Sequence, residues 1–492
     1  MASALPPLPS PSPSLPPPPP AAGGAAGGGA SSGAGAAPRP ALHVVICCCG
    51  TRGDTQPFAA LGLRLQRRGH RVTLATEARM EGFVRGLGLE WRCIAGDMTG
   101  ALLQPGAAER LGDRSAIFTV PAMAKEWELK LERAGCSRED IFRSYEAALA
   151  GADVCVTGTF PSAPSFSVCE KRGIAWLPLL LDCAALPLMR TTAFPMHFTA
   201  FATLGFSCLN GWSYDVAHRI IWGEEGPRIN AWRERELGLK PIRDRAGLAG
   251  IILRKRVPVM VACSTLFCGP RRERPADYLE SWDVGGFAFV PSAEEMGAPI
   301  EPRLVAFLAR AAADTAPVVY LGFGSMAASA ATLVKLAADV CGLARCRAVI
   351  VAGWSDVDTA AAAGNDALLI VKEAPHDWLF PRVRCIVHHC GVGTAAAALR
   401  AGVPQVPVPF LLDQFPNSRT VVGLGVAPRS VAYAGGKLSA AAVAQAVVRA
   451  MDPTQPFAAA AARCGEFVRA ESAGTLDRFA NMVEAARPVT AD

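Results

Sequence analysis

A short segment rich in histidine and glycine, residues 388–394 (HHCGVGT), concentrates groups that could hold a ligand. It leaves a run typical of a buried strand and enters an alanine-rich stretch typical of a helix. Glycines at such a turn let backbone N–H groups approach a ligand, and a helix start carries unpaired donors and partial positive charge, which suits a diphosphate. Thr394 could add a hydroxyl and His389 a ring N–H. A tight turn that binds nothing is the alternative interpretation.

Two neighbouring segments carry further polar groups. Residues 374–380 (APHDWLF) include His376, so three of the seven histidines lie between 376 and 389. The apolar run 403–410 leads into Asp413 and Gln414. An acid and an amide at the end of a strand suit sugar hydroxyls, because each carboxylate oxygen can accept a hydrogen bond from one hydroxyl. These two segments favour a ligand site over a purely structural turn.

Strands must place these groups, and the sequence contains two series of them. Residues 42–49 predict a strand, which is followed by the turn GTRGD (50–54), a helix that ends before Gly69, and a strand at 71–76. This βαβ pattern begins a doubly wound parallel sheet, and later strands are expected at 152–159 and 174–181. The pattern starts again at 316–326, with a helix at 330–345 and strands at 347–354, 367–374 and 383–390. We therefore expect an α/β protein with two facing Rossmann-like domains and a cleft between them.

Length and composition also favour two domains. The chain has 492 residues, of which 51% are hydrophobic and 19% charged. Residues 1–40 differ, with 12 of the 39 prolines and one charged residue, and they predict a disordered tail. The remainder divides into an N-terminal Rossmann-like domain at 41–288 and a C-terminal Rossmann-like domain at 289–470. Residues 471–492 are expected to form a C-terminal helix that packs back on the N-terminal domain.

Charge, cysteines and hydropathy restrict the partners and the compartment. The net charge is +6 and spread along the chain, and no motif indicates nucleic-acid binding. The 16 cysteines show no CxxC pair or zinc spacing and lie mostly in apolar runs, which predicts free thiols in a reducing compartment. The most apolar stretch, 177–189, is shorter than the ~20 residues of a membrane span. We expect a cytoplasmic protein without a secretory signal, with peripheral membrane contact as an open possibility.

The order of the motifs resembles one enzyme family. The segments PHDWLFP, HHCGVGT, VPVPF and DQ are similar to the donor half of GT-B glycosyltransferases, in the branch of sterol 3-β-glucosyltransferases and bacterial antibiotic glycosyltransferases. Residues 50–76 resemble the N-terminal signature of that branch (the family 28 type) nearly residue for residue. The segments at 191–195 (TTAFP), 229–239, 322–326 (GFGSM) and 352–354 follow in the order of the family. The resemblance covers roughly residues 42–485.

The resemblance implies roles by position: residues 41–288 would form the acceptor-binding domain and residues 289–470 the UDP-sugar-binding domain. His389, Val392, Gly393 and Thr394 would hold the diphosphate of a UDP-sugar, with Ser325 as a further nucleotide contact. The uridine would be lined by Glu373, Ala374 and His376, and the sugar hydroxyls bound by Asp413 and Gln414. Thr51, Arg52 and Asp54 would face the reacting centre from the other domain.

Asp54 is the predicted general base, because the acceptor hydroxyl must lose its proton as it attacks the anomeric carbon. Its place in the sequence also resembles that of an N-cap, and a cap beside Arg52 would have a lowered pKa and be a weaker base. Burial by the acceptor would have to raise the pKa again. A purely structural helix cap is the alternative interpretation.

Other candidate residues are assigned structural roles, and some positions depart from the family. His43 lies at the wrong end of its strand, the DVD at 356–358 lacks partner ligands for a metal, and Cys47-Cys48-Cys49 fit small apolar strand positions. Cys390 stands where the usual HHGG has a glycine, and its side chain would crowd the turn if that turn needs a positive φ. Residues 415–418 (FPNS) replace the PFWG typical of the sterol branch.

The resemblance implies an inverting, metal-independent transfer of a sugar, with glucose favoured, from a UDP-sugar to the hydroxyl of a sterol or similar lipophilic acceptor. UDP-glucose is then a co-substrate, and no cofactor or metal is expected. Two alternatives stay open: a UDP-glycosyltransferase acting on another small aglycone such as a flavonoid or polyketide, and a catalytically degenerate protein that binds UDP-sugar or lipid.

Overall fold

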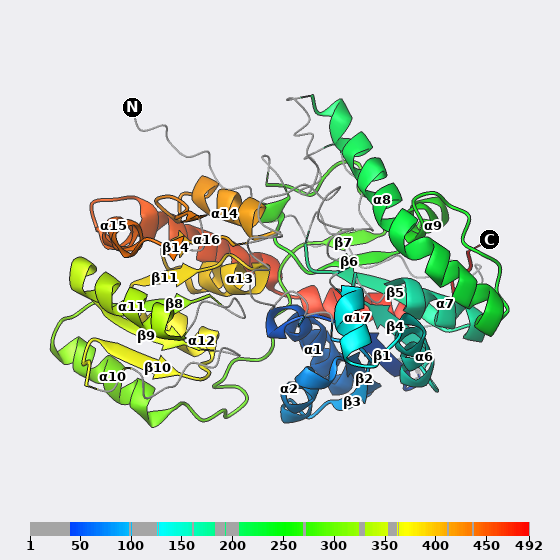
Figure 1. Cartoon of the computed structure of the whole chain (residues 1–492), viewed down its shortest axis with the longest axis horizontal. Helices are drawn as coiled ribbons and strands as arrows, with labels where there is room; N and C mark the ends of the chain where they lie inside the picture. Colours follow the sequence, from blue (N-terminus) through cyan, green and yellow to red (C-terminus); the bar gives the residue numbers. More distant parts are fainter. Residues whose placement is uncertain are drawn as a thin grey trace, which may run out of the picture.

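The computed structural model describes residues 40–97, 127–159, 162–182, 206–268, 272–323, 330–352, 364–410, 413–434 and 437–491, and single residues at 100, 125, 192 and 362. The predicted tail at 1–40 therefore lies outside the described residues except for Pro40. Ser325, the segment at 191–195 apart from Thr192, and the DVD at 356–358 also lie outside them. The described chain forms two lobes, each built around a parallel sheet (Figure 1).

The N-terminal lobe holds a seven-stranded parallel sheet in the order β3-β2-β1-β4-β5-β6-β7. The predicted strand at 71–76 coincides with β2, and the other predicted strands of this half contain the observed ones. The helices expected loosely within 191–250 are α8, which continues as a short π-helix at Arg233–Leu237, and the start of α9. The elements are β1 His43–Cys47, α1 Arg52–Arg67, β2 Arg71–Thr76, α2 Glu81–Gly86, β3 Glu90–Cys93, α6 Arg138–Ala148, β4 Val154–Thr157, α7 Ser162–Arg172, β5 Ala175–Leu180, α8 Cys208–Trp232, α9 Leu248–Lys255, β6 Val259–Val261 and β7 Trp282–Val284.

The C-terminal lobe repeats this plan with a five-stranded parallel sheet in the order β10-β9-β8-β11-β12. Its elements are α10 Pro302–Ala313, β8 Val318–Gly322, α11 Ala330–Ala344, β9 Arg347–Val351, β10 Leu368–Val371, α12 His376–Leu379, β11 Cys385–His388, α13 Val392–Ala401, β12 Gln405–Pro407, α14 Gln414–Gly423, β13 Tyr433–Ala434, β14 Lys437–Leu438, α15 Ala440–Met451, α16 Phe457–Ser472 and α17 Thr475–Ala485.

Both sheets reverse their strand order at their first strand. In one sheet the order turns between β1 and β4, and in the other between β8 and β11. The carboxyl edge beside such a reversal is where open α/β sheets bind ligands. Because β1 leads into the turn before α1 and β11 into the turn before α13, both predicted ligand turns lie at these reversals.

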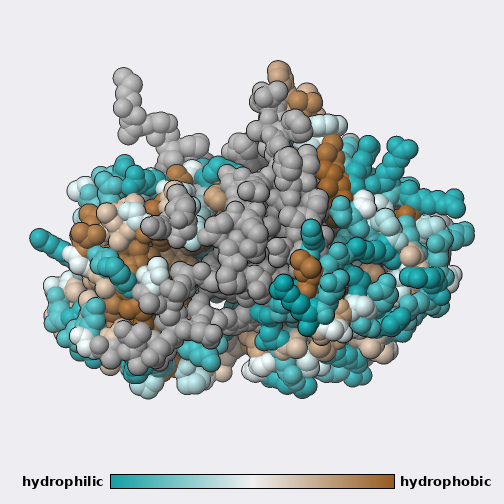
Figure 2. Space-filling view, in the orientation of Figure 1, coloured by the Kyte–Doolittle hydropathy of each residue, from teal (hydrophilic) through white to brown (hydrophobic). Residues whose placement is uncertain are grey.

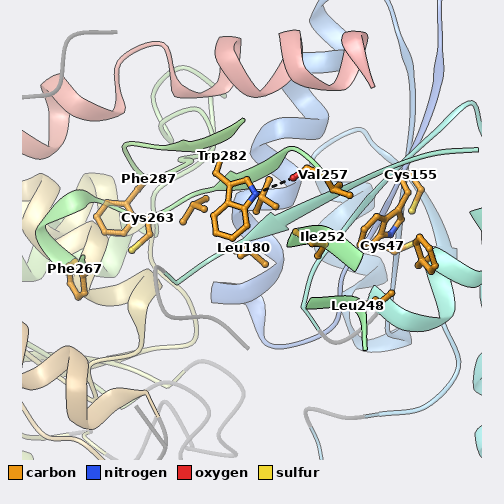
Figure 3. Packing of buried hydrophobic residues seen from close by; sticks show 14 of the residues in the cluster. Cys47, Cys155, Leu180, Leu248, Ile252, Val257, Cys263, Phe267, Trp282 and Phe287 are labelled. Carbon is orange, nitrogen blue, oxygen red and sulfur yellow. Dashed lines mark hydrogen bonds between the residues drawn. The ribbon is translucent and has the colours of Figure 1, made fainter. Parts of the chain in front are cut away.

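The cores are built from strands that are apolar on both faces, as parallel sheets covered by helices require. Cys47 and Cys155 are fully buried among aliphatic and aromatic side chains, and Trp282 donates its indole N–H to the Val257 carbonyl at 3.1 Å (Figure 3). Each described cysteine is free, and most of them are buried. The side-chain hydrogen bond with Cys155 and then burial raise the pKa of the Cys47 thiol above its usual range, and burial raises the pKa of the Cys155 thiol. These thiols act as small hydrophobic residues, which confirms the interpretation of the sequence.

The last helix of the chain lies against the first. Arg64 and Arg68 of α1 bind Asp477 of α17, and Arg68 also binds Glu484 at 3.0 Å. On the other side of α17, Arg478 binds Asp283 in β7 at 2.9 Å. The chain therefore returns to the N-terminal sheet after completing the C-terminal one.

Candidate active site at the meeting of two helix starts

The turn before α1 fixes a carboxylate. Thr51 is the N-cap, and the Asp54 Oδ2 atom accepts hydrogen bonds from the Thr51 N–H at 2.7 Å and the Thr51 hydroxyl at 2.9 Å. Gly50 has a φ of +132°, and a Cβ there would lie 2.5 Å from that same oxygen. Only glycine therefore leaves room for the Asp54 carboxylate.

The expectation that Asp54 is the N-cap was wrong. The helix begins at Arg52, one turn earlier than the apolar pattern indicates, so Asp54 is the third helical residue and Thr51 is the cap. The expected lowering of the Asp54 pKa was wrong as well. Burial raises the pKa of the Asp54 carboxyl, and the hydrogen bonds from Thr51 only partly oppose that effect. A raised pKa makes the carboxylate a stronger base.

His388 is a structural residue. Its fully buried ring accepts a hydrogen bond at Nδ1 from the Cys390 N–H at 3.2 Å, so the proton lies on Nε2, which donates to the Gln405 side-chain oxygen at 2.8 Å. Burial lowers the pKa of His388 to about 3. Both ring nitrogens are used within the protein, and none remains for a ligand.

His389 differs from its neighbour. Its half-buried ring has an Nδ1 atom that no described residue contacts by a hydrogen bond. Burial lowers the pKa of His389 to about 4, against a smaller opposite effect of the Gly322 backbone, so the imidazole is neutral at physiological pH. A buried polar atom without a partner carries a free-energy cost that a bound ligand would relieve.

The turn after His389 contains the predicted strain. Cys390 is buried and has a φ of +66°, a conformation that non-glycine residues rarely adopt, which confirms the expected crowding. The Asn417 side chain donates to the Cys390 carbonyl at 3.1 Å and holds the turn. A Cβ at Gly391 would lie 2.5 Å from the His389 Nε2 atom, so this glycine is required by the position of the histidine ring.

The starts of α1 and α13 meet across the cleft. Gly391 is the N-cap of α13 and offers no side chain to the helix donors. A Cβ on Gly393, in the first turn of α13, would lie 3.4 Å from the Cα atom of Gly53, in the first turn of α1. The two positive helix ends therefore face one region, where an anion would satisfy donors of both. Val392 and Thr394 are half-buried beside it.

A second carboxylate reaches this region from α14. Asp413 is the N-cap of α14 and accepts a hydrogen bond from the Asn417 side chain at 2.9 Å. Burial and then the nearby carboxylates of Asp182 and Asp54 together raise the pKa of Asp413 to about 7. Gln414 is buried, and its side-chain oxygen accepts the Phe410 N–H at 2.9 Å, so part of its amide is engaged within the loop.

The residues predicted for the uridine lie on the edge of the same cleft. Glu373 is exposed and forms an ion pair with Arg52 at 2.7 Å. The His376 ring stacks on Phe380 at 4.3 Å between centroids, and its Nε2 atom lies 3.4 Å from the Tyr320 hydroxyl. Burial and then the Arg52 charge lower the pKa of His376 to about 4. Ala374 is half-buried and packs against the core of this lobe.

Sequence reasoning missed two residues of this site. Gly50 was predicted only as part of a glycine turn. In the structure, a side chain at this position would collide with the Asp54 carboxylate. Asp182, which lies inside the apolar stretch at 177–189, was given no role in the sequence analysis. Its position two residues after β5 was the available signal, since β5 ends at the same sheet edge as β1. Among the described residues, no group of three His, Cys, Asp or Glu side chains could hold a metal ion.

Comparison with known proteins agrees with this geometry. Residues 44–157 match the glycosyltransferase family 28 N-terminal domain, and residues 346–474 match the erythromycin biosynthesis protein CIII-like C-terminal domain. The chain belongs to the GT-B glycosyltransferases. The first domain contains the Asp54 turn and the second contains the turn of His389 and α13.

The chain is similar in sequence to sterol 3-beta-glucosyltransferases. A sterol 3-beta-glucosyltransferase of Leptosphaeria maculans is 31% identical over 392 residues, and one of Arabidopsis thaliana is 29% identical over 404 residues. The matches cover 78% and 80% of this chain but 25% and 61% of those proteins, so the chain spans only part of their length.

Crystal structures of antibiotic glycosyltransferases share the fold. The glycotransferase of kitacinnamycin superposes with a TM-score of 0.61 at 17% identity, covering 92% of this chain and all of the other. VinC in complex with dTDP superposes with a TM-score of 0.55 at 17% identity, covering 89% of this chain and all of VinC. The GT-B fold expected from the sequence is confirmed.

Proposed function

We propose that this chain transfers a sugar, preferentially glucose, from UDP to the hydroxyl of a sterol or similar lipophilic acceptor, with inversion and without a metal ion. The proposal depends chiefly on one observation. The half-buried carboxylate of Asp54 stands in the first turn of α1, and that turn contacts the start of α13 through Gly53 and Gly393. A base and an anion site from different lobes thus meet in one place.

The reaction follows from this arrangement. The acceptor oxygen attacks the anomeric carbon from the face opposite the diphosphate, and its proton passes to the Asp54 carboxylate. The bond between the anomeric carbon and the diphosphate oxygen breaks, and UDP leaves with the electron pair. Backbone N–H groups at the start of α13, the Thr394 hydroxyl and the His389 ring stabilise the charge that develops on the diphosphate.

Specificity for the donor is assigned to the C-terminal lobe. Glu373, Ala374 and His376 would line the uridine, with Ser325 as a further contact. Asp413 would bind sugar hydroxyls, and its pKa of about 7 lets the carboxyl either donate or accept near neutral pH. Gln414 would bind the sugar through its side-chain amide. The names of the relatives support a sterol acceptor. The matched segments cover only part of those relatives.

Contact with a membrane surface is a further part of the proposal. Phe206, Leu209 and Trp212, at the start of α8, are 61%, 38% and 49% exposed, and Figure 2 shows hydrophobic surface along this helix. Aromatic side chains at an exposed helix end suit the interface of a bilayer, where a lipophilic acceptor would be found. No described helix is long and apolar enough to cross a membrane. The free cysteines support a reducing, cytoplasmic location.

The test is mass spectrometry of products from a mixed pool of UDP-sugars, sterols and flavonoid or polyketide aglycones. We expect a hexosylated sterol, formed equally well with EDTA, and a β-anomeric signal by NMR if UDP-glucose is the donor. Product only from non-sterol acceptors would replace the acceptor class. UDP binding by calorimetry without any product would show a degenerate binding protein.

A further inference from the structure

We propose that Arg52 and Glu373 form a clamp across the cleft that positions Asp54 against the donor site, so that both act as positioning residues in the proposed reaction. The two residues lie 321 positions apart in the chain and belong to different lobes. Arg52 is the first residue of α1, and Glu373 follows β10. Their side chains meet at 2.7 Å although they are 47% and 57% exposed.

The position of Arg52 needs an explanation beyond its own helix. A cation at a helix start is unfavourable, because that end already carries partial positive charge. The guanidinium lies 5.0 Å from the Phe83 ring centroid, which holds it from its own lobe. The carboxylate that offsets its charge comes from the other lobe, and this indicates a role between lobes.

The neighbouring helix contact gives such a carboxylate a further role. Gly53 and Gly393 bring two positive helix ends together, and of the two helices only α1 has a carboxylate, Asp54, in its own first turn. Glu373 supplies negative charge beside this contact and would keep the lobes in register before the donor binds. Asp54 is two residues from Arg52 in the same helical turn, so the position of Arg52 relative to Glu373 also sets the position of the base.

A double-mutant cycle separates a clamp from two independent donor contacts. For a half-exposed pair we expect Arg52→Ala and Glu373→Ala each to lower kcat/KM about fivefold. The variant R52A/E373A should be no worse than either single variant, and the charge reversal R52E/E373R should recover at least half of the activity. Activity of the wild type should fall as salt screens the pair, and R52A/E373A should be less sensitive.

The opposite pattern would overturn the clamp. If each side chain binds the donor independently, the losses multiply to about 25-fold, and R52E/E373R is the weakest variant because the carboxylate introduced at position 52 would repel the diphosphate. Arg71→Ala is the matched control: Arg71 forms an exposed ion pair with Glu90 at 3.0 Å, at the start of β2 and away from the ligand edge. Its kcat/KM should equal that of the wild type.

A structural measurement keeps the clamp testable if the proposed function fails. The radius of gyration of the free full chain, from small-angle X-ray scattering, should be larger for R52A and E373A than for the wild type or R71A, and R52E/E373R should restore it. Unchanged scattering together with multiplicative losses contradicts the clamp. Absence of product from the wild type, with these scattering shifts present, would contradict the proposed function alone.

Discussion

The turns before α1 and α13 are built alike and used differently. Each turn follows an inner strand of its sheet, lies where the strand order reverses, and leads into a helix. At α1 the cap is Thr51, and the first turn is filled by the Asp54 carboxylate, which accepts two hydrogen bonds from that cap. At α13 the cap is Gly391, and no described side chain forms a capping hydrogen bond with the helix start. One turn therefore presents a base, and the other leaves its donors for an anion.

The largest effect should come from removing the base in the first turn. Asp54→Asn keeps the size and polarity of the side chain but cannot take a proton at neutral pH. We expect turnover to fall about 10³-fold, within the usual range for a general base, while UDP affinity stays within about twofold. Initial rates and calorimetry measure the two effects.

A matched capping box provides the control for Asp54. Asp140 occupies the same third position in α6 and accepts the Ser137 N–H at 2.9 Å, but its side chain is exposed. Asp140→Asn should lower the melting temperature slightly and leave turnover per folded molecule unchanged. Equal losses of turnover from both variants would mean that Asp54 serves only the capping box.

The second turn should be most sensitive at His389. We expect His389→Ala to lower kcat about 10²-fold, because one preorganised donor to the developing charge is lost. His388→Ala should have the opposite pattern of effects, because both ring nitrogens of His388 are hydrogen-bonded within the protein, to Gln405 and Cys390. The melting temperature should fall in His388→Ala, while its kcat per folded molecule changes little. A larger kcat loss at 388 than at 389 would reverse this assignment.

A matched pair of glycine substitutions compares the two turns directly. A Cβ at Gly50 would lie 2.5 Å from the Asp54 carboxylate and require a φ of +132°, whereas one at Gly393 would lie 3.4 Å from Gly53. Gly50→Ala should displace the base and lower kcat about 10- to 100-fold. Gly393→Ala should lower it no more than about fivefold. Similar kcat values for both variants would show that the carboxylate tolerates the displacement.

The pH dependence of stability tests the buried carboxyl of Asp413. Its raised pKa means that the folded state binds more protons than the unfolded state between about pH 4 and 7, so this group lowers stability as pH rises through that window. The melting temperature of Asp413→Asn relative to the wild type should therefore increase from pH 4.5 to about 7 and then level off. Asp452→Asn is the control, because the lowered pKa of exposed Asp452 keeps its titration below the window.

The sequence predicts most of this architecture because strand ends and glycine turns are local features. It identified β2, the turn of His388–Thr394 and the helix that follows it. It did not predict the raised pKa of Asp54, because that shift is caused by burial at the cleft, which no local pattern encodes. Asp182 was missed for a related reason: its proximity to Asp413 depends on both the order of the strands and the approach of the other lobe.

The smallest effect should come from Cys390, where the second turn departs from the family. Cys390→Gly removes the cost of a positive φ on a non-glycine residue, ~1 kcal/mol, but also deletes a buried thiol worth a similar amount. We expect a change of less than about 3 °C in melting temperature and of less than about twofold in kcat. Because Asn417 holds the Cys390 carbonyl, the backbone should stay in place in the variant. A large gain in kcat would mean that the side chain, and not only the backbone, limits how the diphosphate fits against α13.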